Sequence, residues 1–412
     1  MLRRCVLLSV LVLAGCYGAG PYSPTTTATA TPPPADPPAT STPPVSTPPP
    51  TTTSPSDPPT PPVTTPPPVS TPPPVSTPST PQVIHAWGNS QTQGYGLADC
   101  AGGGTDPNRC VSPSAWPQIM ANAKGWTADN QAVGGTTCAN LTVGGNTESP
   151  WDLQIDADSV NIYAQFHNEQ VQFGPLAYHV SYARNCIEAQ TAWLAIPENG
   201  KIRAINAVQG GGSWVAGPNS ASATTTTAGA NLTFTVTGKT VYLATARVYD
   251  STTAIYTVNV DGNLLVDPDT GSSQFNQVQD TEGPALANFI RVPGTQNTTH
   301  TIVYTCIDPG GSGCLVFYAA GVGGSQVPSV YSLSPVPNAS WNTQYNFDPA
   351  TSDLYRNAWL ALVAELQSDG LNIIPVDVLK SGYDPDTQSQ ADGVHEDVAG
   401  HASIGTYAAT LK

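Results

Sequence analysis

The chain has 412 residues, with 29 acidic and 13 basic side chains, a net charge of −16 and only 10% charged residues. Sites for nucleic acid or anionic lipid headgroups need clustered lysine and arginine, so this composition argues against both kinds of partner. Of the 42 prolines, 25 fall in residues 21–81 together with 17 threonines. That segment has too little aliphatic content to offset the entropy of folding, which leaves residues 83–412 as the part able to build a core.

The N-terminus has the pattern of an export signal. Two arginines precede the apolar run Val6–Leu13, which is too short to cross a bilayer as a helix. The run ends in Leu13-Ala14-Gly15-Cys16, which resembles the bacterial lipobox. That resemblance implies removal of residues 1–15 and acylation of Cys16, and so a lipid anchor in the bacterial cell envelope on the extracytoplasmic side. The alternative is an ordinary signal peptide with a chance cysteine.

Residues 16–82 are predicted to form a disordered tether. The run Pro66-Pro67-Pro68-Val69-Ser70-Thr71 repeats at once over Pro72–Thr77. Proline-rich chain favours extended polyproline II, which would hold the folded part away from a membrane surface. The same composition could instead serve as a ligand for proline-recognising domains.

The cysteines indicate an oxidising compartment. Of the eight cysteines, one is removed with the signal and one is the predicted lipidation site. Six cysteines remain, which is an even number. Two pairs are separated by short glycine-rich loops, and the remaining two cysteines would form a third pair. We therefore predict the disulfides Cys100–Cys110, Cys138–Cys186 and Cys306–Cys314. Because there is no Cys-x-x-Cys motif, a zinc site is not expected, and nothing in the sequence calls for another metal or a cofactor.

Strands and helices alternate along residues 83–200 and again along 325–412. This alternation predicts an α/β fold in three layers, with a parallel sheet flanked by helices. The expected strands are Val83–Trp87, Trp126–Val133, Ser159–Phe166 and Leu371–Val376, and the expected helices are Ser114–Gly125, Leu176–Ile196, Ser352–Ser368 and Asp397–Thr410.

Residues 201–324 follow a different pattern. Short runs alternate apolar and polar residues, as in Leu232–Val236 and Ile255–Val260, and turns such as Asp261-Gly262 separate them. No helical periodicity occurs. We expect a jelly-roll-like β-sandwich inserted into the α/β domain, because surface loops tolerate long insertions at small entropic cost.

Polar, glycine-containing segments follow the expected strands. They are Gly88–Gly94, Asn130–Thr137, His167–Glu169 and, before the last helix, Asp392–His395. Open α/β sheets place their sites at the carboxyl ends of the strands, where Ser90 would lie. A carboxylate three residues before a histidine, as in Asp392-x-x-His395, can orient the ring and fix its tautomer.

In this order the four segments resemble the blocks of the SGNH (GDSL-like) hydrolase family, over residues 83–199 and 325–412. The resemblance implies that Ser90 is the nucleophile, His395 the general base and Asp392 the residue that orients His395. It also implies an oxyanion hole formed by the backbone N–H groups of Ser90 and Gly135 and by the Asn168 amide. Gly135 is preferred to Gly134 because it lies five residues after Asn130, as in the family pattern.

The sequence departs from the family at three positions. Asn89 replaces the usual aspartate before the serine, Phe166 replaces a glycine, and Glu169 replaces an aspartate. The resemblance implies a serine esterase acting on an acylated carbohydrate or a small ester, with acetyl as the expected acyl group. The departures favour, as an alternative, a non-catalytic glycan-binding lipoprotein with a degenerate hydrolase domain. A lipid esterase or thioesterase is a third possibility.

Other histidines and aromatic residues have simpler interpretations. His401 is expected to pack or cap a helix, and His85 and His167 to be structural. The tryptophans within the expected strands and helices belong to the core. Trp341 and Tyr345 lie in a loop after the insertion and are better candidates for stacking on a sugar.

Overall fold

The computed structural model describes residues 82–100, 111–143, 149–174, 176–247, 254–268, 270–277, 286–323, 328–342 and 349–412. The predicted signal, Cys16, almost all of the predicted tether, Cys110 and Tyr345 lie outside these ranges. Over the described ranges, no helix combines the length and the apolar character needed to cross a bilayer.

Five parallel strands form one sheet in the order β15-β14-β3-β1-β2. They are β1 (Val83–Gly88), β2 (Thr127–Asn130), β3 (Val160–Ala164), β14 (Ser329–Leu333) and β15 (Asn372–Val376). Strand β14 was not predicted from the sequence. Its two serines make the run look polar, but Ser332 is buried and accepts a hydrogen bond from the Trp359 indole N–H at 2.9 Å.

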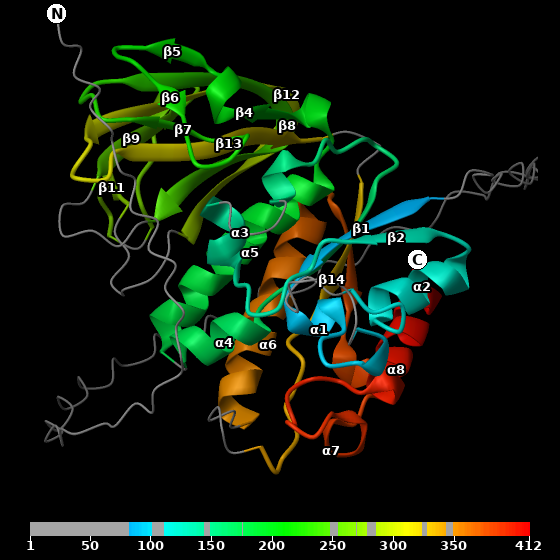
Figure 1. Ribbon diagram of the computed structural model, residues 1–412. Helices are drawn as coiled ribbons and strands as arrows, with labels where there is room; N and C mark the ends of the chain where they lie inside the picture. The colour runs from blue at the N-terminus through cyan, green and yellow to red at the C-terminus, as the bar shows by residue number, and fades with distance from the viewer. Residues whose placement is uncertain are drawn as a thin grey trace, which may run out of the picture. The chain divides into compact units, whose positions relative to one another are not determined.

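Helices cover both faces of the parallel sheet, as the alternation of strands and helices predicts (Figure 1). Helices α2 (Trp116–Lys124) and α8 (Val398–Thr410) pack together on one face, and α5 (Ala177–Ala195) and α6 (Pro349–Ser368) pack on the other. Successive residues of β3 point to opposite faces: Ile162 joins the core under α2 and α8, and Tyr163 joins the core under α5 and α6. The shorter helices are α1 (Ser90–Gln93), α3 (Cys138–Val143), α4 (His167–Phe173) and α7 (Pro385–Gln388).

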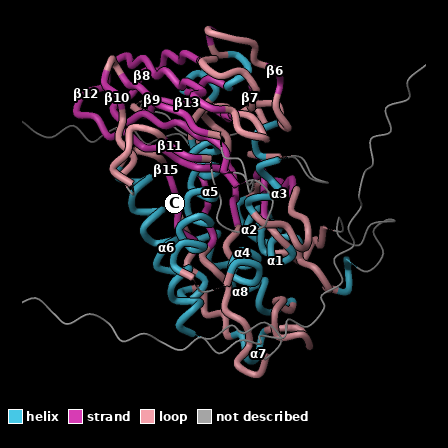
Figure 2. Tube along the Cα trace, turned by 90° about the vertical axis from the view of Figure 1, so that its left-hand side faces the viewer, coloured by secondary structure: helices cyan, strands magenta, loops and turns pink. Residues whose placement is uncertain are grey.

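A ten-stranded antiparallel sheet is inserted between α5 and β14, in the part of the chain predicted to be all β. Its strands are β4 (Lys201–Arg203), β5 (Val208–Gly210), β6 (Val215–Ala216), β7 (Ala223–Thr225), β8 (Asn231–Arg247), β9 (Ile255–Val260), β10 (Asn263–Leu264), β11 (Phe275–Asn276), β12 (Leu286–Asp308) and β13 (Cys314–Val322). Figure 2 shows these strands gathered beside α5.

Strand β8 explains how this insertion differs from a sandwich of two separate sheets. Its first half alternates buried apolar residues with outward-facing threonines, and its second half is buried on both faces. There Leu243 faces the interior of the insertion, and Tyr242 joins the core shared with α5. Strands β8 and β12 pair along nearly their whole length, and all ten strands belong to one hydrogen-bonded sheet. Where the register of β8 and β12 shifts, a Cβ on Gly238 would lie 2.4 Å from the Val322 nitrogen, so only glycine permits this approach.

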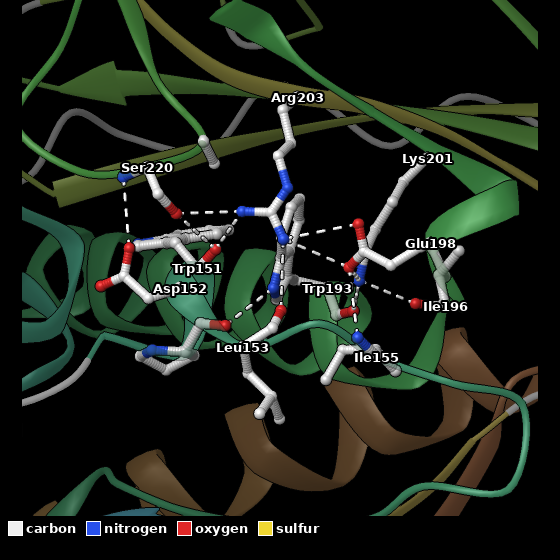
Figure 3. Close-up of polar contacts among 12 residues, drawn as sticks. Trp151, Asp152, Leu153, Ile155, Trp193, Ile196, Glu198, Lys201, Arg203 and Ser220 are labelled. Atoms are coloured by element: carbon white, nitrogen blue, oxygen red, sulfur yellow. Dashed lines mark hydrogen bonds and ion pairs between the residues drawn. The ribbon is translucent and has the colours of Figure 1, made fainter. Parts of the chain in front are cut away.

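Two basic side chains hold the start of the insertion against the α/β part (Figure 3). The buried Lys201 Nζ donates to the carbonyls of Trp193 and Ile196, at 2.9 and 2.8 Å, at the C-terminal end of α5. The Arg203 guanidinium lies 4.8 Å from the Trp193 ring centroid and donates to the Leu153 carbonyl at 3.2 Å. A helix C-terminus favours positive charge, and burial lowers the pKa of Lys201 to about 7. These contacts fix the insertion to the end of α5.

Two of the predicted disulfides are present, Cys138–Cys186 and Cys306–Cys314. The first joins α3 to α5, and the second links the end of β12 to the start of β13. The pairing predicted for Cys100 involves Cys110, which lies outside the described residues.

Candidate active site

Strand β1 ends in a sharp turn that places Ser90 at the carboxyl edge of the parallel sheet. A Cβ on Gly88 would lie 2.3 Å from the Thr92 hydroxyl and 2.7 Å from the Ala164 carbonyl, so the turn needs glycine there. Asn89 caps α1 by accepting a hydrogen bond from the Gln91 backbone N–H at 3.0 Å. Because capping needs only a side-chain oxygen, asparagine performs it as an aspartate would.

Ser90, His395 and Asp392 form one chain of hydrogen bonds. His395 Nε2 lies 2.8 Å from Ser90 Oγ, and His395 Nδ1 lies 2.6 Å from Asp392 Oδ2. An ionised carboxylate can only accept, so Nδ1 carries the proton and Nε2 is left to accept from the Ser90 hydroxyl. This is the geometry that activates a serine hydroxyl for attack on a carbonyl carbon.

A tight turn before α8 holds the histidine in this position. Asp392 Oδ1 accepts from the backbone N–H groups of Val394 and His395 at 2.9 and 3.0 Å. Gly393 has φ of 65°, a left-handed conformation that glycine adopts without strain. Burial by itself would raise the pKa of Asp392, but the hydrogen bonds from the His395 ring and the two backbone N–H groups keep it well below its ordinary value. The carboxylate therefore stays ionised beside the imidazole.

The segment after β2 is bound to the serine turn. Asn130 Nδ2 donates to the Thr92 carbonyl at 2.9 Å, and Asn130 Oδ1 accepts from the Ala132 N–H at 3.0 Å. A Cβ on Gly134 would lie 3.7 Å from the Ser90 Cβ, so this backbone passes directly beside the serine. Gly135 has φ of 79°, and a Cβ there would meet open space. Within the part of the chain that the structure describes, the backbone N–H groups of Ser90 and Gly135 donate to no acceptor.

The segment after β3 reaches the same edge. Asn168 Nδ2 donates one hydrogen to the Thr136 carbonyl at 2.8 Å, and this contact places its amide beside the Gly135 segment. Glu169 is fully buried and accepts from the backbone N–H groups of Cys138 and Phe166, at 2.6 and 2.8 Å. Burial raises the pKa of Glu169 to about 7. The glutamate thus fastens the start of α4 to the start of α3.

Phe166 stands where the sequence resemblance predicts a glycine, and its backbone has a conformation that favours glycine. Its φ is 87°, in the left-handed region that L-residues rarely adopt. The ring is 1% exposed and packs edge-to-face on Tyr355, with centroids 6.4 Å apart. Burial of the ring therefore offsets the strain at this position.

Phe166→Gly is expected to lower the free energy of unfolding by about 2 kcal/mol. Removing a buried phenylalanine ring costs about 3–5 kcal/mol, and relief of the backbone strain returns about 1–3 kcal/mol. The measurement is the urea midpoint, with Phe166→Leu as control because leucine keeps the Cβ and thus the strain. A Gly variant more stable than the original protein would show that strain dominates at this position.

Three other histidines, His167, His401 and His85, each contact neighbouring segments of the fold. His167 is buried among Gln91 and the Val336 carbonyl, and burial lowers its pKa to about 4. His401 accepts from the Trp116 backbone N–H at 3.4 Å and ties α8 to α2. His85 pairs with Asp129 at 3.0 Å across β1 and β2.

Sequence reasoning missed two residues at the site. The Tyr95 ring lies 5.1 Å from the His395 ring, centroid to centroid. Gln390 donates to the carbonyls of Tyr95 and Glu396, at 2.7 and 2.9 Å, and joins the serine loop to the histidine turn. Neither residue belongs to a motif, and only the folded backbone brings them to this edge.

A cavity of about 570 Å³ lies elsewhere. It lies between the insertion and the α/β part, near residues that precede β3 and β15, and none of the four polar segments lines it. In those ranges, no group of three or more His, Cys, Asp or Glu side chains is arranged to hold a metal ion.

No protein-family model and no curated protein matches the chain. Among solved structures, the chain is similar to a two-domain esterase active on acetylated mannans, co-crystallised with mannopentaose (10% identity, 60% of this chain and 92% of that one, TM-score 0.30). It is also similar to a putative lipolytic protein of the G-D-S-L family from Desulfitobacterium hafniense DCB-2 (9% identity, 80% and 98%, TM-score 0.34). A third is the CBM36-1 domain of a xylanase from the hindgut metagenome of Trinervitermes trinervoides (12% identity, 30% and 97%, TM-score 0.22). With TM-scores below 0.5, these matches carry no conclusion about function.

Proposed function

We propose that this chain is a serine ester hydrolase of the SGNH (GDSL-like) type. It removes acyl groups from a carbohydrate, and acetyl is the expected acyl group. The observation that carries the proposal is the hydrogen-bonded chain Ser90–His395–Asp392 at the carboxyl edge of a parallel sheet. The three residues come from two segments about 300 positions apart, with a separation of 305 between Ser90 and His395. The hydrogen bond joins the first residue of α1 to the turn before α8, so the fold brings two distant polar segments to one point.

In the proposed reaction, Ser90 Oγ attacks the ester carbonyl carbon as His395 Nε2 takes its proton. Asp392 stabilises the imidazolium that forms. The protonated His395 then gives its proton to the departing alcohol oxygen, the ester C–O bond breaks, and an acyl-serine remains. A water molecule, deprotonated by His395, attacks the acyl carbon, and the proton returns to Ser90 as the carboxylic acid leaves.

The negative charge on the carbonyl oxygen would be met by three donors. These are the backbone N–H groups of Ser90 and Gly135, and the Asn168 amide hydrogen that does not bind Thr136. Backbone donors fixed by a glycine turn lose no freedom at the moment of reaction, so they stabilise the developing charge more than the uncharged substrate.

Release of acetate from a panel of acetylated oligosaccharides tests this function. We expect turnover with at least one glycan, and hydrolysis of p-nitrophenyl acetate. Esters with acyl chains of increasing length distinguish this function from the lipid-esterase alternative, which predicts higher activity on long acyl chains.

The second candidate is a glycan-binding protein without turnover. It is favoured by the strained Phe166 at a position that the family keeps for glycine. Glycan affinity without hydrolysis of any ester would support it.

Asn168→Ala is expected to lower kcat by about 10²–10³ with little change in KM, because one oxyanion donor typically contributes this much. The melting temperature should change little, since the variant gives up one hydrogen bond to a loop carbonyl. If Asn168 only holds that loop in place, the melting temperature of the variant will fall and its folded molecules will keep the original kcat.

We also propose that the mature chain begins at a lipidated Cys16 and is held in the bacterial envelope. Support comes from the residues before Cys16 and from the proline-rich segment that follows. Cys16→Ser is expected to move the protein from the membrane fraction to the soluble fraction, and the intact mass of the original protein should include acyl groups. Identical partitioning of the two proteins would contradict the proposal.

A further inference from the structure

Two exposed aromatic rings border the Ser90–His395–Asp392 chain. Tyr95 follows α1, is 39% exposed and has its ring centroid 5.1 Å from that of His395. Trp341 follows β14 and is 50% exposed. The structure describes all eight tryptophans, and Trp341 is the one that is exposed.

Trp341 lies directly on the turn that carries the histidine. A Cβ on Gly393 would come within 2.8 Å of the indole Cη2, so the ring rests against the backbone between Asp392 and Val394. Two hydrogen bonds hold this contact: the Ala339 N–H donates to the Gly393 carbonyl at 2.9 Å, and Asn342 Nδ2 donates to the Asp392 carbonyl at 2.6 Å. The indole is therefore positioned at the site but left uncovered.

The segment before Trp341 adds polar groups. A cavity of about 360 Å³ is lined by five residues of this segment, by three residues of α6 and by Leu379. The five residues are Pro335, Pro337, Asn338, Ala339 and Ser340. Asn338 lines it, and neither its side-chain nitrogen nor its oxygen has water access or a hydrogen-bond partner among the described residues. Buried amide atoms are costly to leave unpaired, so rotation of the Asn338 amide toward a ligand hydroxyl in the cavity would relieve that cost.

We propose that Tyr95 and Trp341 bind the sugar ring that bears the ester, and that the Asn338 amide pairs with hydroxyls of that carbohydrate. The proposal rests on the esterase function above. A pyranose offers an apolar C–H face to an aromatic ring and a rim of hydroxyls to an amide, which matches this combination of side chains. An acyl chain would use the apolar rings but would leave Asn338 unpaired. The site is thus specific for the alcohol part of the ester.

The test compares an acetylated oligosaccharide with vinyl acetate, which lacks a ring. For Trp341→Ala and Tyr95→Ala, kcat/KM for the sugar ester should fall at least tenfold more than for vinyl acetate. Trp341→Phe, which retains a ring, should recover most of the loss. The control is Tyr178→Ala: Tyr178 is 42% exposed on α5, and its ring contacts are with His179 and Tyr182. Equal losses on both substrates would overturn the sugar proposal and leave the esterase function intact.

Binding without turnover separates the two proposals. In Ser90→Ala protein, an acetylated oligosaccharide should protect the fluorescence of the exposed Trp341 from quenching by iodide. If the Trp341 indole is the protected fluorophore, this protection should be absent in the double variant Ser90→Ala, Trp341→Phe. Protection in Ser90→Ala protein, together with no hydrolysis of any ester by the original protein, would contradict the esterase function but support the sugar site. Absence of protection at saturating sugar ester, in a protein that hydrolyses vinyl acetate, would overturn the sugar site alone.

Discussion

Ser90→Ala is expected to lower kcat for ester hydrolysis by about 10⁶, because a serine–histidine–aspartate unit that lacks its nucleophile loses nearly all of its catalytic effect. The hydroxyl is the only group removed, and its contact is with His395 at 2.8 Å. Binding of substrate should change little, since Asn168, Tyr95 and Trp341 remain in place. The measurement is acetate release at saturating substrate, followed long enough to detect residual turnover.

The control for this variant is Ser403→Ala on α8. Ser403 Oγ accepts a hydrogen bond from Gln388 at 3.1 Å, so its removal also deletes one side-chain contact. Both variants should melt within a few degrees of the original protein. If Ser90→Ala retained more than a small fraction of the original kcat, another residue would be the nucleophile.

Asp392→Asn is expected to lower kcat by about 10⁴ with the fold preserved. Asparagine can still accept from the backbone N–H groups of Val394 and His395. Its amide nitrogen, however, would face His395 Nδ1, and a donor there favours the tautomer with the proton on Nε2. That tautomer cannot accept the Ser90 proton. The substitution also removes the Asp392 carboxylate, whose negative charge stabilises the imidazolium form of His395.

A second aspartate–histidine pair gives a matched control. Asp261 Oδ2 lies 2.6 Å from His300 Nδ1 on the antiparallel sheet, the same separation as in the Asp392–His395 pair. Asp261→Asn should leave kcat within a factor of about two, because His300 Nε2 contacts the Gly238 carbonyl and the Thr298 hydroxyl, at 3.1 and 3.2 Å, and not Ser90. If both variants lost activity equally, the effect would come from global stability and not from the tautomer of His395.

Several parts of the fold could be predicted from the sequence because they depend on local periodicity and turn chemistry. The long apolar helix α5 and the alternating strands of the insertion are of this kind. The disulfide Cys306–Cys314 is also of this kind, because a short glycine-rich loop separates its cysteines, whereas Cys138–Cys186 was predicted only as the pair left over. Strand β14 could not be predicted, since its burial depends on neighbours on both sides and on a tryptophan that pairs with Ser332. The pairing of all ten strands of the insertion in one sheet could not be predicted either, because strand pairing between distant segments leaves no local signal.

The sequence by itself determined which residues are able to do chemistry: a serine on a glycine turn, a carboxylate three residues before a histidine, and an asparagine after a strand. The tertiary structure decided that Ser90 and His395 meet, because strand order in a parallel sheet brings the carboxyl ends of distant strands to one edge. It also decided that a phenylalanine holds a left-handed backbone at position 166, since the burial of its ring is a contact with residues far along the chain. Finally, it decided that Trp341 is exposed beside the histidine turn and that the other tryptophans lie in or against the core. Exposure is a property of the packed fold, in which each side chain competes for burial with all of its neighbours.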